Sequence, residues 1–353
     1  MATLAATTAT IGAGDRLRPV RIWLYFVAFL VLMMVVLGGI TRLTGSGLSI
    51  TEWQPISGTI PPLSLADWQA EFQNYQRIPQ YTELNQGMSL DEFKFIFWWE
   101  WAHRLLGRII GVAFAIPFLV FLAQRRFSWD LAAPLAGLFV LGGLQGALGW
   151  WMVSSGLSEL TSVSQYRLAA HLFAASLLFI ALIWVARRLD PEPVARTSAS
   201  RAPVVILLLL VLLQIVAGAF VAGLDAGFSY NTWPLMGDSF VPRGLGEIQP
   251  WWRDIFENVT TVQFNHRMIA YVLVAYVAVL MFVRRGRGFA GVEGWLPRIV
   301  FLVLLQAVLG IGTLVMGVPI WLALGHQALA FMLAGTITAY LADLSSRYNN
   351  TDS

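Results

Sequence analysis

Residues 95–108 read FIFWWEWAHRLLGR, which places a carboxylate, an imidazole and two guanidinium groups near the start of a long apolar run. Ionisable side chains are expensive in a bilayer, so those that lie there usually serve a function. Glu100 and His103 are three residues apart and share one face of a helix. A related phrase, QFNHR at residues 263–267, recurs later without the acid. This likeness, and this one difference, indicate a duplicated membrane structure whose halves differ in chemistry.

The composition is that of a polytopic membrane protein. Of 353 residues, 57% are hydrophobic and only 12% are charged, whereas a soluble domain carries roughly 25% charged residues. The arginines are scattered at the ends of apolar runs, so no nucleic-acid partner is expected. Cysteine is absent, which excludes disulfides, thiolate metal sites, iron–sulfur clusters and cysteine nucleophiles. The four histidines are therefore the candidate imidazole ligands for a transition metal or haem.

Eight apolar runs are each long enough to cross a hydrocarbon core of about 30 Å. We predict an all-α polytopic membrane protein with an N-terminal tail (1–19), a linker (191–202) and a C-terminal tail (344–353). The short loops on one side are rich in arginine, so the positive-inside rule places both termini and the linker in the cytoplasm. Two long loops, about 43–94 and 225–258, are then external. The approximate limits of the eight spans are 20–42, 95–124, 130–154, 166–187, 203–224, 259–283, 296–317 and 319–343.

The chain divides into two similar halves, residues 20–190 and 203–343. Four phrases recur at offsets of about 180, 163, 161 and 155 residues, which drift as loop lengths differ. Four helices are followed by four in the same orientation, so the repeat is parallel and its pseudo-two-fold axis lies along the membrane normal. The expected structure is two pseudo-two-fold related four-helix bundles, side by side.

The four histidines are predicted in the outer half of the membrane, each on an even-numbered span. Haem takes axial ligands on opposite faces, which two facing helices with one histidine each can supply. One bis-histidine site per half follows: His103 with His171, and His266 with His326. Two alternatives stay open. Each histidine can hydrogen-bond within a polar helix contact, or the histidines can bind a non-haem metal, which would want three or four ligands together, usually with carboxylates.

Four arginines near the histidines are candidates for binding haem propionates, because guanidinium groups pair well with carboxylates. Snorkelling to lipid headgroups is the competing role for each of them. The four are Arg104, Arg108, Arg167 and Arg267.

Glu100 distinguishes the two halves, since Gln263 stands at the matching position. A carboxylate one turn from an axial ligand, in low dielectric, has a perturbed affinity for protons. It could accept a proton during oxidation or stabilise a cationic intermediate. We therefore interpret the first half as the reactive site and the second as a permanent haem site. A purely structural, hydrogen-bonded Glu100 is the alternative.

Seven phrases closely resemble the haem A synthase family, in its proteobacterial and mitochondrial subgroup, and they span nearly the whole chain. The resemblance implies eight helices in two halves, and oxidation of the C8 methyl group of haem O to a formyl group, which gives haem A for terminal oxidases. Two successive hydroxylations would give a geminal diol, which loses water to form the aldehyde. The phrases are GGITRLTGSGLS (38–49), EWAHRLLGR (100–108), LQGALGWWMV (144–153), YRLAAHL (166–172), FVAGLDAG (220–227), QFNHR (263–267) and HQ (326–327).

The resemblance also implies roles for single residues and partners. His266 and His326 would bind the iron of haem b, while His103 and His171 would face the substrate haem, with Glu100 taking part in catalysis. The expected partners are haem O synthase, oxidase assembly factors and membrane lipids, and small-residue helix faces permit a homo-oligomer. The expected location is the bacterial inner membrane, with the haem sites toward the periplasm. Some bacterial relatives carry a cysteine pair in an external loop, which this chain lacks.

Two other functions compete with this interpretation. A di-haem membrane cytochrome b that carries electrons from quinol explains both histidine pairs but gives no role to Glu100. A transporter is less consistent, because the four histidines and a parallel repeat have no natural role there.

Overall fold

Eight helices in the structure are long and apolar enough to cross a membrane. The structure is a computed structural model that describes residues 13–158, 160–190, 200–284 and 294–345, and within these ranges it contains helices and no β-strand. The predicted class, an all-α polytopic membrane protein with eight spans, is therefore confirmed. The eight helices are α1 (Ala13–Leu43), α3 (Leu90–Ala123), α4 (Trp129–Ser154), α5 (Gln165–Arg188), α6 (Ala202–Gly223), α8 (Val259–Arg284), α9 (Trp295–Val315) and α10 (Ile320–Asp343).

The largest differences from the predicted spans lie at two helix starts. Residues 13–19, predicted as part of the N-terminal tail, belong to α1. Helix α3 begins at Leu90 rather than near residue 95, because Ser89 and Glu92 form a capping box ahead of the apolar run. The rest of the N-terminal tail, most of the predicted linker and most of the C-terminal tail lie outside the described residues. The two-fold axis and the cytoplasmic placement of the termini stay predictions.

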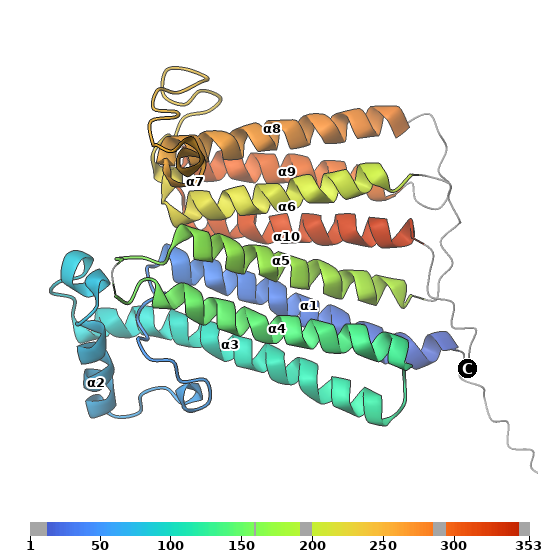
Figure 1. Ribbon diagram of the computed structural model, residues 1–353, viewed down its shortest axis with the longest axis horizontal. Coiled ribbons are helices and arrows are strands. Elements are labelled where there is room, and N and C mark those ends of the chain that lie inside the picture. The colour runs from blue at the N-terminus through green and yellow to red at the C-terminus, as the bar shows by residue number, and fades with distance from the viewer. Residues whose placement is uncertain (1–12, 159, 191–199, 285–293, 346–353) are drawn as a thin grey trace, which may run out of the picture.

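The helices of the two halves lie side by side in Figure 1, with α1, α3, α4 and α5 on one side and α6, α8, α9 and α10 on the other. Helices α1, α5, α6 and α10 make the contacts between the halves. Leu182 of α5, Leu207 of α6 and Ile337 of α10 are fully buried in one common apolar cluster. Across the same seam, the Gln327 amide donates a 3.1 Å hydrogen bond to the Val35 carbonyl. The halves therefore share a core instead of forming two independent bundles.

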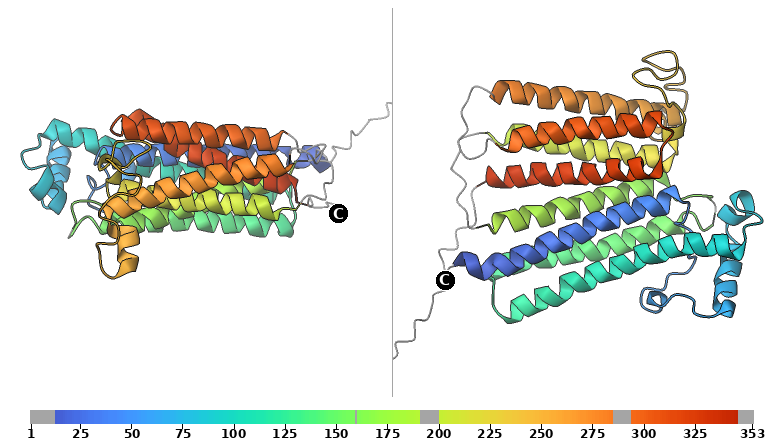
Figure 2. Two further views of the ribbon diagram at one scale, coloured as in Figure 1. Left: turned by 90° about the horizontal axis from the view of Figure 1, so that it is seen from above. Right: turned by 180° about the vertical axis from the view of Figure 1, so that it is seen from behind.

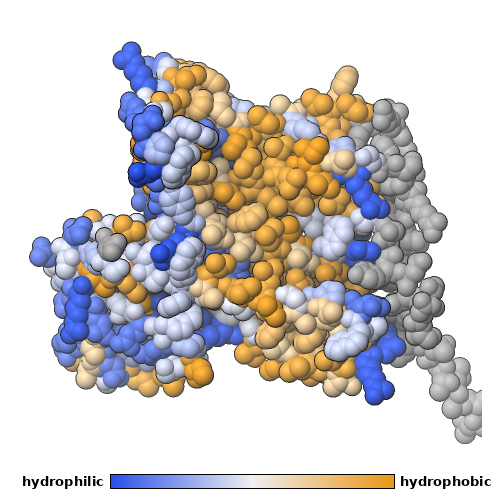
Figure 3. Space-filling view, in the orientation of Figure 1, coloured by the Kyte–Doolittle hydropathy of each residue, from blue (hydrophilic) through white to orange (hydrophobic). Residues whose placement is uncertain are grey.

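A band of hydrophobic residues covers the middle of the face shown in Figure 3, with hydrophilic residues at both ends. Both long loops lie at one end of the bundle, and α1 starts at the other (Figures 1 and 2). A band of this kind is what a hydrocarbon core requires of the helices that cross it. The distribution supports a multi-pass membrane protein with both long loops on one side.

Aromatic side chains fasten the first long loop to the start of α3. This loop carries η1 (Ser57–Thr59), α2 (Leu65–Tyr75) and η2 (Gln80–Leu84), and the second long loop carries η3 (Ala226–Phe228) and α7 (Trp251–Glu257). The ring of Trp68 lies 4.9 Å from that of Phe97, and the ring of Tyr75 lies 5.3 Å from that of Phe93. Edge-to-face and tilted pairs at these distances stabilise the packing beyond the burial of their area. The first loop therefore forms an aromatic cap over α3.

A buried carboxylate organises the second long loop. Asp254, only 3% exposed, accepts 3.0 Å hydrogen bonds from the backbone N–H groups of Gly246 and Ile248. It also accepts hydrogen bonds from the Thr261 hydroxyl and the Asn258 amide at the start of α8. Burial raises the pKa of Asp254, but these four donors outweigh burial and hold the pKa at about 2.

Asp254→Asn is therefore expected to destabilise the loop by about 2 kcal/mol at neutral pH, the usual contribution of hydrogen bonds to a charged group. Because the folded pKa is depressed, the stabilisation is present above the ordinary value of 3.8 and is lost as the pH falls toward 2. The measurement is protease resistance of residues 225–258 at several pH values. Asp238→Asn, at an exposed position of the same loop, is the control. Equal resistance of wild type and Asp254→Asn at pH 7 would contradict the assignment.

Candidate functional site

The four histidines lie on α3, α5, α8 and α10, toward the end of the bundle that carries the long loops. All four side chains are half-buried. The rings of His266 and His326 face each other with centres 6.4 Å apart and planes at 74°. His103 and His171 are close enough to interact electrostatically. The structure thus brings together both of the pairs that the sequence indicates.

The spacing of His266 and His326 fits a haem iron between them. Bonds of about 2 Å from one metal to an imidazole nitrogen on each side place the ring centres roughly 6 Å apart. The Nδ1 atoms of His103, His171 and His326 are buried with no hydrogen-bond partner in the protein, although buried polar atoms are normally paired. An imidazole nitrogen without a partner is available to a metal. Among the described residues, no three histidine, aspartate or glutamate side chains form a metal cluster, so the non-haem metal alternative lacks a site there.

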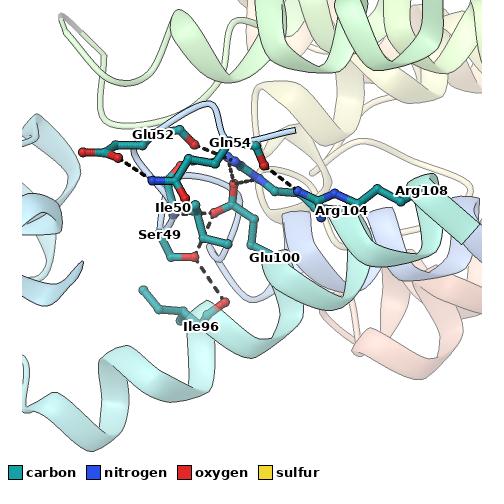
Figure 4. Close-up of polar contacts among 8 residues, drawn as sticks. All are labelled: Ser49, Ile50, Glu52, Gln54, Ile96, Glu100, Arg104 and Arg108. Carbon is teal, nitrogen blue, oxygen red and sulfur yellow. Dashed lines mark hydrogen bonds and ion pairs between the residues drawn. The ribbon is translucent and has the colours of Figure 1, made fainter. Parts of the chain in front are cut away.

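Glu100 is held by four donors from the protein itself (Figure 4). Its side chain is buried on the face of α3 that meets the loop after α1, and the residue is 3% exposed. One carboxylate oxygen accepts hydrogen bonds from the Ser49 hydroxyl and the Ile50 N–H group, both at 2.8 Å. The other accepts two from the Arg104 guanidinium, the shorter at 2.7 Å. An acid and an arginine four residues apart share a helix face, so α3 supplies both members of this ion pair.

The arginines that follow two of the histidines fasten the two long loops in the same manner. Each donates to a matching pair of backbone carbonyls in the segment that follows the first helix of its own half, at distances between 2.7 and 2.9 Å. The carbonyls belong to Ile50 and Glu52 for Arg104, and to Tyr230 and Thr232 for Arg267. Arg267 also donates to the Leu235 carbonyl at 3.2 Å. Ile50 and Tyr230 are 180 residues apart, as are Glu52 and Thr232, which is the first offset of the repeat and supports the predicted duplication.

Arg108 also binds the first long loop, whereas Arg167 binds the end of helix α4. Arg108 donates to the carbonyls of Gln54 and Pro55, both at 2.8 Å. Arg167 donates to the Trp151 carbonyl and lies 4.6 Å above the Trp151 ring. Their role in binding propionates stays a prediction. In its favour, Nη1 of Arg108 and Nε of Arg267 are buried without a partner, so each of these two guanidinium groups retains a free donor.

A cavity of about 300 Å³ lies on the loop side of the Glu100–Arg104 pair. Glu52, Glu71, Arg104 and Arg108 contribute to its walls. One carboxylate oxygen of Glu71, on α2, is buried there without a partner. Burial raises the pKa of Glu71, and the neighbouring carboxylate of Glu52 raises it further. A polar space with a proton-accepting group therefore adjoins the ion pair.

The second half has amide groups where the first half has the acid. Gln263 is 2% exposed and donates to the Tyr230 carbonyl at 3.2 Å. Gln214 and Gln306 donate to the backbone carbonyls of the ligand candidates His266 and His326, at 3.1 and 2.9 Å. These bonds tie helices α6 and α9 to the segments that carry the histidines.

The corresponding glutamine in the first half is unpaired. Both amide atoms of Gln145, which matches Gln306 in the repeat, are buried with no partner. The hydrogen bond from the Gln214 amide to the His266 carbonyl could not be predicted from the sequence. The first half has no glutamine at the matching position, so the repeat gave no indication of it. The bond from Ser49 to Glu100 could not be predicted either, because Ser49 precedes Glu100 by 51 residues. The place of Ser49 in the phrase at 38–49, one of those that carry the family resemblance, was the one available signal.

Comparison with known proteins gives one consistent answer. The chain matches a family model described as cytochrome oxidase assembly protein over residues 21–338. A heme A synthase from Mesorhizobium japonicum is 51% identical over 354 residues, covering 99% of this chain and 97% of the relative. Heme A synthases from Azorhizobium caulinodans and Agrobacterium fabrum are 54% and 52% identical, each over 94% of this chain and over 95% and 92% of their own lengths.

Proposed function

Because this chain belongs to the cytochrome oxidase assembly protein family, we propose that it is a haem A synthase, a membrane enzyme that converts haem O into haem A. The reaction oxidises the C8 methyl group of haem O to a formyl group. Two successive hydroxylations give a geminal diol, and loss of water gives the aldehyde. The identity to heme A synthases over nearly the full chain supports this enzyme and gives no support to a di-haem electron carrier.

In this proposal the first half is the reactive half. The observation that carries the assignment is the ion pair between the buried Glu100, one turn before His103, and Arg104, directly after His103. The second half has the neutral Gln263 in place of Glu100. His103 and His171 face the iron of the substrate. His266 and His326, whose rings stand 6.4 Å apart, hold haem b as a permanent group. Haem b supplies one-electron redox chemistry when it is bound.

The protein groups around the substrate have separate tasks. Arg104 fixes the direction of the Glu100 side chain through two hydrogen bonds to one carboxylate oxygen. A fixed negative charge beside the reacting centre stabilises positive charge that develops during oxidation, and it can take up a released proton. The cavity that contains Glu71 lies on the loop side of this pair and offers the proton a route outward. The free donors of Arg108 and Arg267 support a role of these two residues in binding haem propionates.

The proposed location and partners of the protein follow from the same assignment. The arginine-rich short loops support a location in a bacterial inner membrane with the long loops and both haem sites toward the periplasm. Haem O is poorly soluble, so direct transfer from haem O synthase within the membrane is the natural supply route. Oxidase assembly factors and a second copy of this chain are further partners in the proposal, the latter through small-residue helix faces.

The test is to express the full chain with a source of haem O and to extract and identify the haems. Haem A in the extract, together with haem b that copurifies with the protein, is the expected result. Folded preparations that contain haem b but leave haem O unchanged would refute the enzymatic assignment. A quickly reducible second permanent haem without a formyl product would instead indicate an electron carrier.

A further inference from the structure

Each of the four histidine rings packs against a glycine on a neighbouring helix. A Cβ atom built on any of these glycines would come within 3.4 Å of the Cε1 atom of the facing imidazole. The distances are 3.0 Å for Gly38 and His103, 3.4 Å for Gly149 and His171, 3.2 Å for Gly218 and His266, and 2.8 Å for Gly310 and His326.

The four contacts follow one pattern. In each case the glycine lies on the membrane-spanning helix that precedes the histidine's helix: α1 before α3, α4 before α5, α6 before α8, and α9 before α10. The nearest ring atom is Cε1 in all four. Other glycines of these helices do not share the feature, since a Cβ on Gly142, Gly146 or Gly325 would meet nothing within 4 Å. Some other glycines of the bundle also leave no room for a Cβ, as Gly39 does against the Gln327 amide oxygen at 2.5 Å, but among the described glycines only these four face a histidine ring.

A methyl group at these positions would compete with the ring for space. Carbon atoms that are not bonded to each other prefer separations of about 3.5–4.0 Å, so a Cβ at 2.8–3.2 Å forces the imidazole to move. The ring can yield by rotating about its side-chain torsions. Rotation turns the ring nitrogens away from their present direction. Alanine otherwise favours a helix over glycine, so the ring contact is a specific reason for glycine here.

We propose that Gly38, Gly149, Gly218 and Gly310 are positioning residues that set the orientation of the four imidazoles for ligation of haem iron. The inference rests on the proposed function, in which these histidines bind haem. The separations predict an order of sensitivity to alanine, with Gly310 the most sensitive, then Gly38, then Gly218. Gly149 is the least sensitive, because 3.4 Å is close to an ordinary contact.

The experiment compares Gly310→Ala with Gly325→Ala in the full-length protein. Gly325 precedes His326 directly but has open space at its Cβ position, so it controls for the added methyl group on the same pair of helices. Gly310→Ala is expected to weaken haem b binding by about tenfold or more, the usual effect of disturbing a group that orients a metal ligand. Haem b per polypeptide, the low-spin electron paramagnetic resonance g values and the reduction potential are measured. Gly325→Ala keeps wild-type values of all three.

If Gly310→Ala fails to fold, Gly218→Ala tests whether these glycines orient the imidazole rings. At 3.2 Å the His266 ring has to give way by only a few tenths of an ångström, so the fold is expected to survive, with shifted g values and a shifted reduction potential. Unchanged g values and potential in a folded Gly310→Ala or Gly218→Ala protein would overturn the inference, even if thermal stability falls. His326→Ala tests the underlying assignment separately. If His326→Ala keeps haem b with wild-type spectra, the proposed function fails, whatever the glycine variants do.

Discussion

Replacement of Glu100 by glutamine is expected to lower haem A formation by about 100-fold or more, as for removal of a positioned acid or base, while haem b stays bound. The carboxylate is buried one turn before His103 and is held by Ser49, Ile50 and Arg104. Glutamine has nearly the same shape, but it carries no negative charge and does not take up a proton. The measurement is quantification of haems O, A and B extracted from cells that supply haem O.

Two further variants separate chemistry from structure at this site. Glu100→Gln leaves Arg104 without its carboxylate, and breaking a buried ion pair by removing one partner costs about 3–5 kcal/mol. The double variant Glu100→Gln, Arg104→Gln removes both charges, and it is expected to stay inactive if the carboxylate is needed for the reaction. Gln263→Leu, at the matching position of the other half, is expected to form haem A normally. Normal haem A formation by Glu100→Gln would remove Glu100 from the mechanism, whereas joint loss of haem A and haem b would show a structural role.

His326→Ala is expected to abolish binding of haem b and, with it, the formation of haem A. Its ring faces that of His266 at 6.4 Å, and no other histidine lies on α10 or α8 to replace it. Even disturbing a group that merely supports a metal ligand weakens metal binding by about 10–100-fold, so deletion of the ligand itself is more severe. The measurement is the absorption spectrum of the purified protein and its haem b content per polypeptide.

His171→Ala is the matched variant in the other half. It is expected to keep haem b with a wild-type spectrum and to lose haem A formation, because the proposed function assigns His171 to the substrate and not to the permanent group. Added imidazole is expected to restore part of the low-spin spectrum of His326→Ala by occupying the vacated ligand position. If His171→Ala loses haem b and His326→Ala retains it, the assignment of the two halves is reversed.

The helices could be predicted from the sequence because the membrane imposes a simple rule. An uninterrupted apolar run of sufficient length must form a helix that satisfies its own backbone, and most of the spans begin and end within a few residues of their predicted limits. The exceptions have local causes. The capping box of Ser89 and Glu92 extends α3 into the loop, and residues 13–19 extend α1 ahead of the apolar run.

The histidine pairs were also predictable, since an internal repeat places equivalent residues at equivalent depth. The surroundings of Glu100 were not, because Ser49 and Ile50 reach it from a loop whose path the apolar pattern does not determine. The contacts between the arginines and the loops could not be predicted for the same reason. The spacing of the arginines from the histidines indicated propionate binding, but it did not show that Arg104 and Arg267 also donate to loop carbonyls. The contacts between glycines and imidazole rings could not be predicted from the sequence either, because they depend on how each helix is rotated about its own axis.

The core shared by the two halves has a consequence for biosynthesis. Leu182 on α5 belongs to the segment that emerges first from the ribosome, while its cluster partners Leu207 and Ile337 belong to the later one. The bond from Gln327 to the Val35 carbonyl likewise joins the last inserted helix to the first. Until α6 and α10 are inserted, the seam on α1 and α5 lacks its partners, and the N-terminal half is unfinished. A gene divided between α5 and α6 would thus yield two fragments that reach their final form only by associating in the membrane.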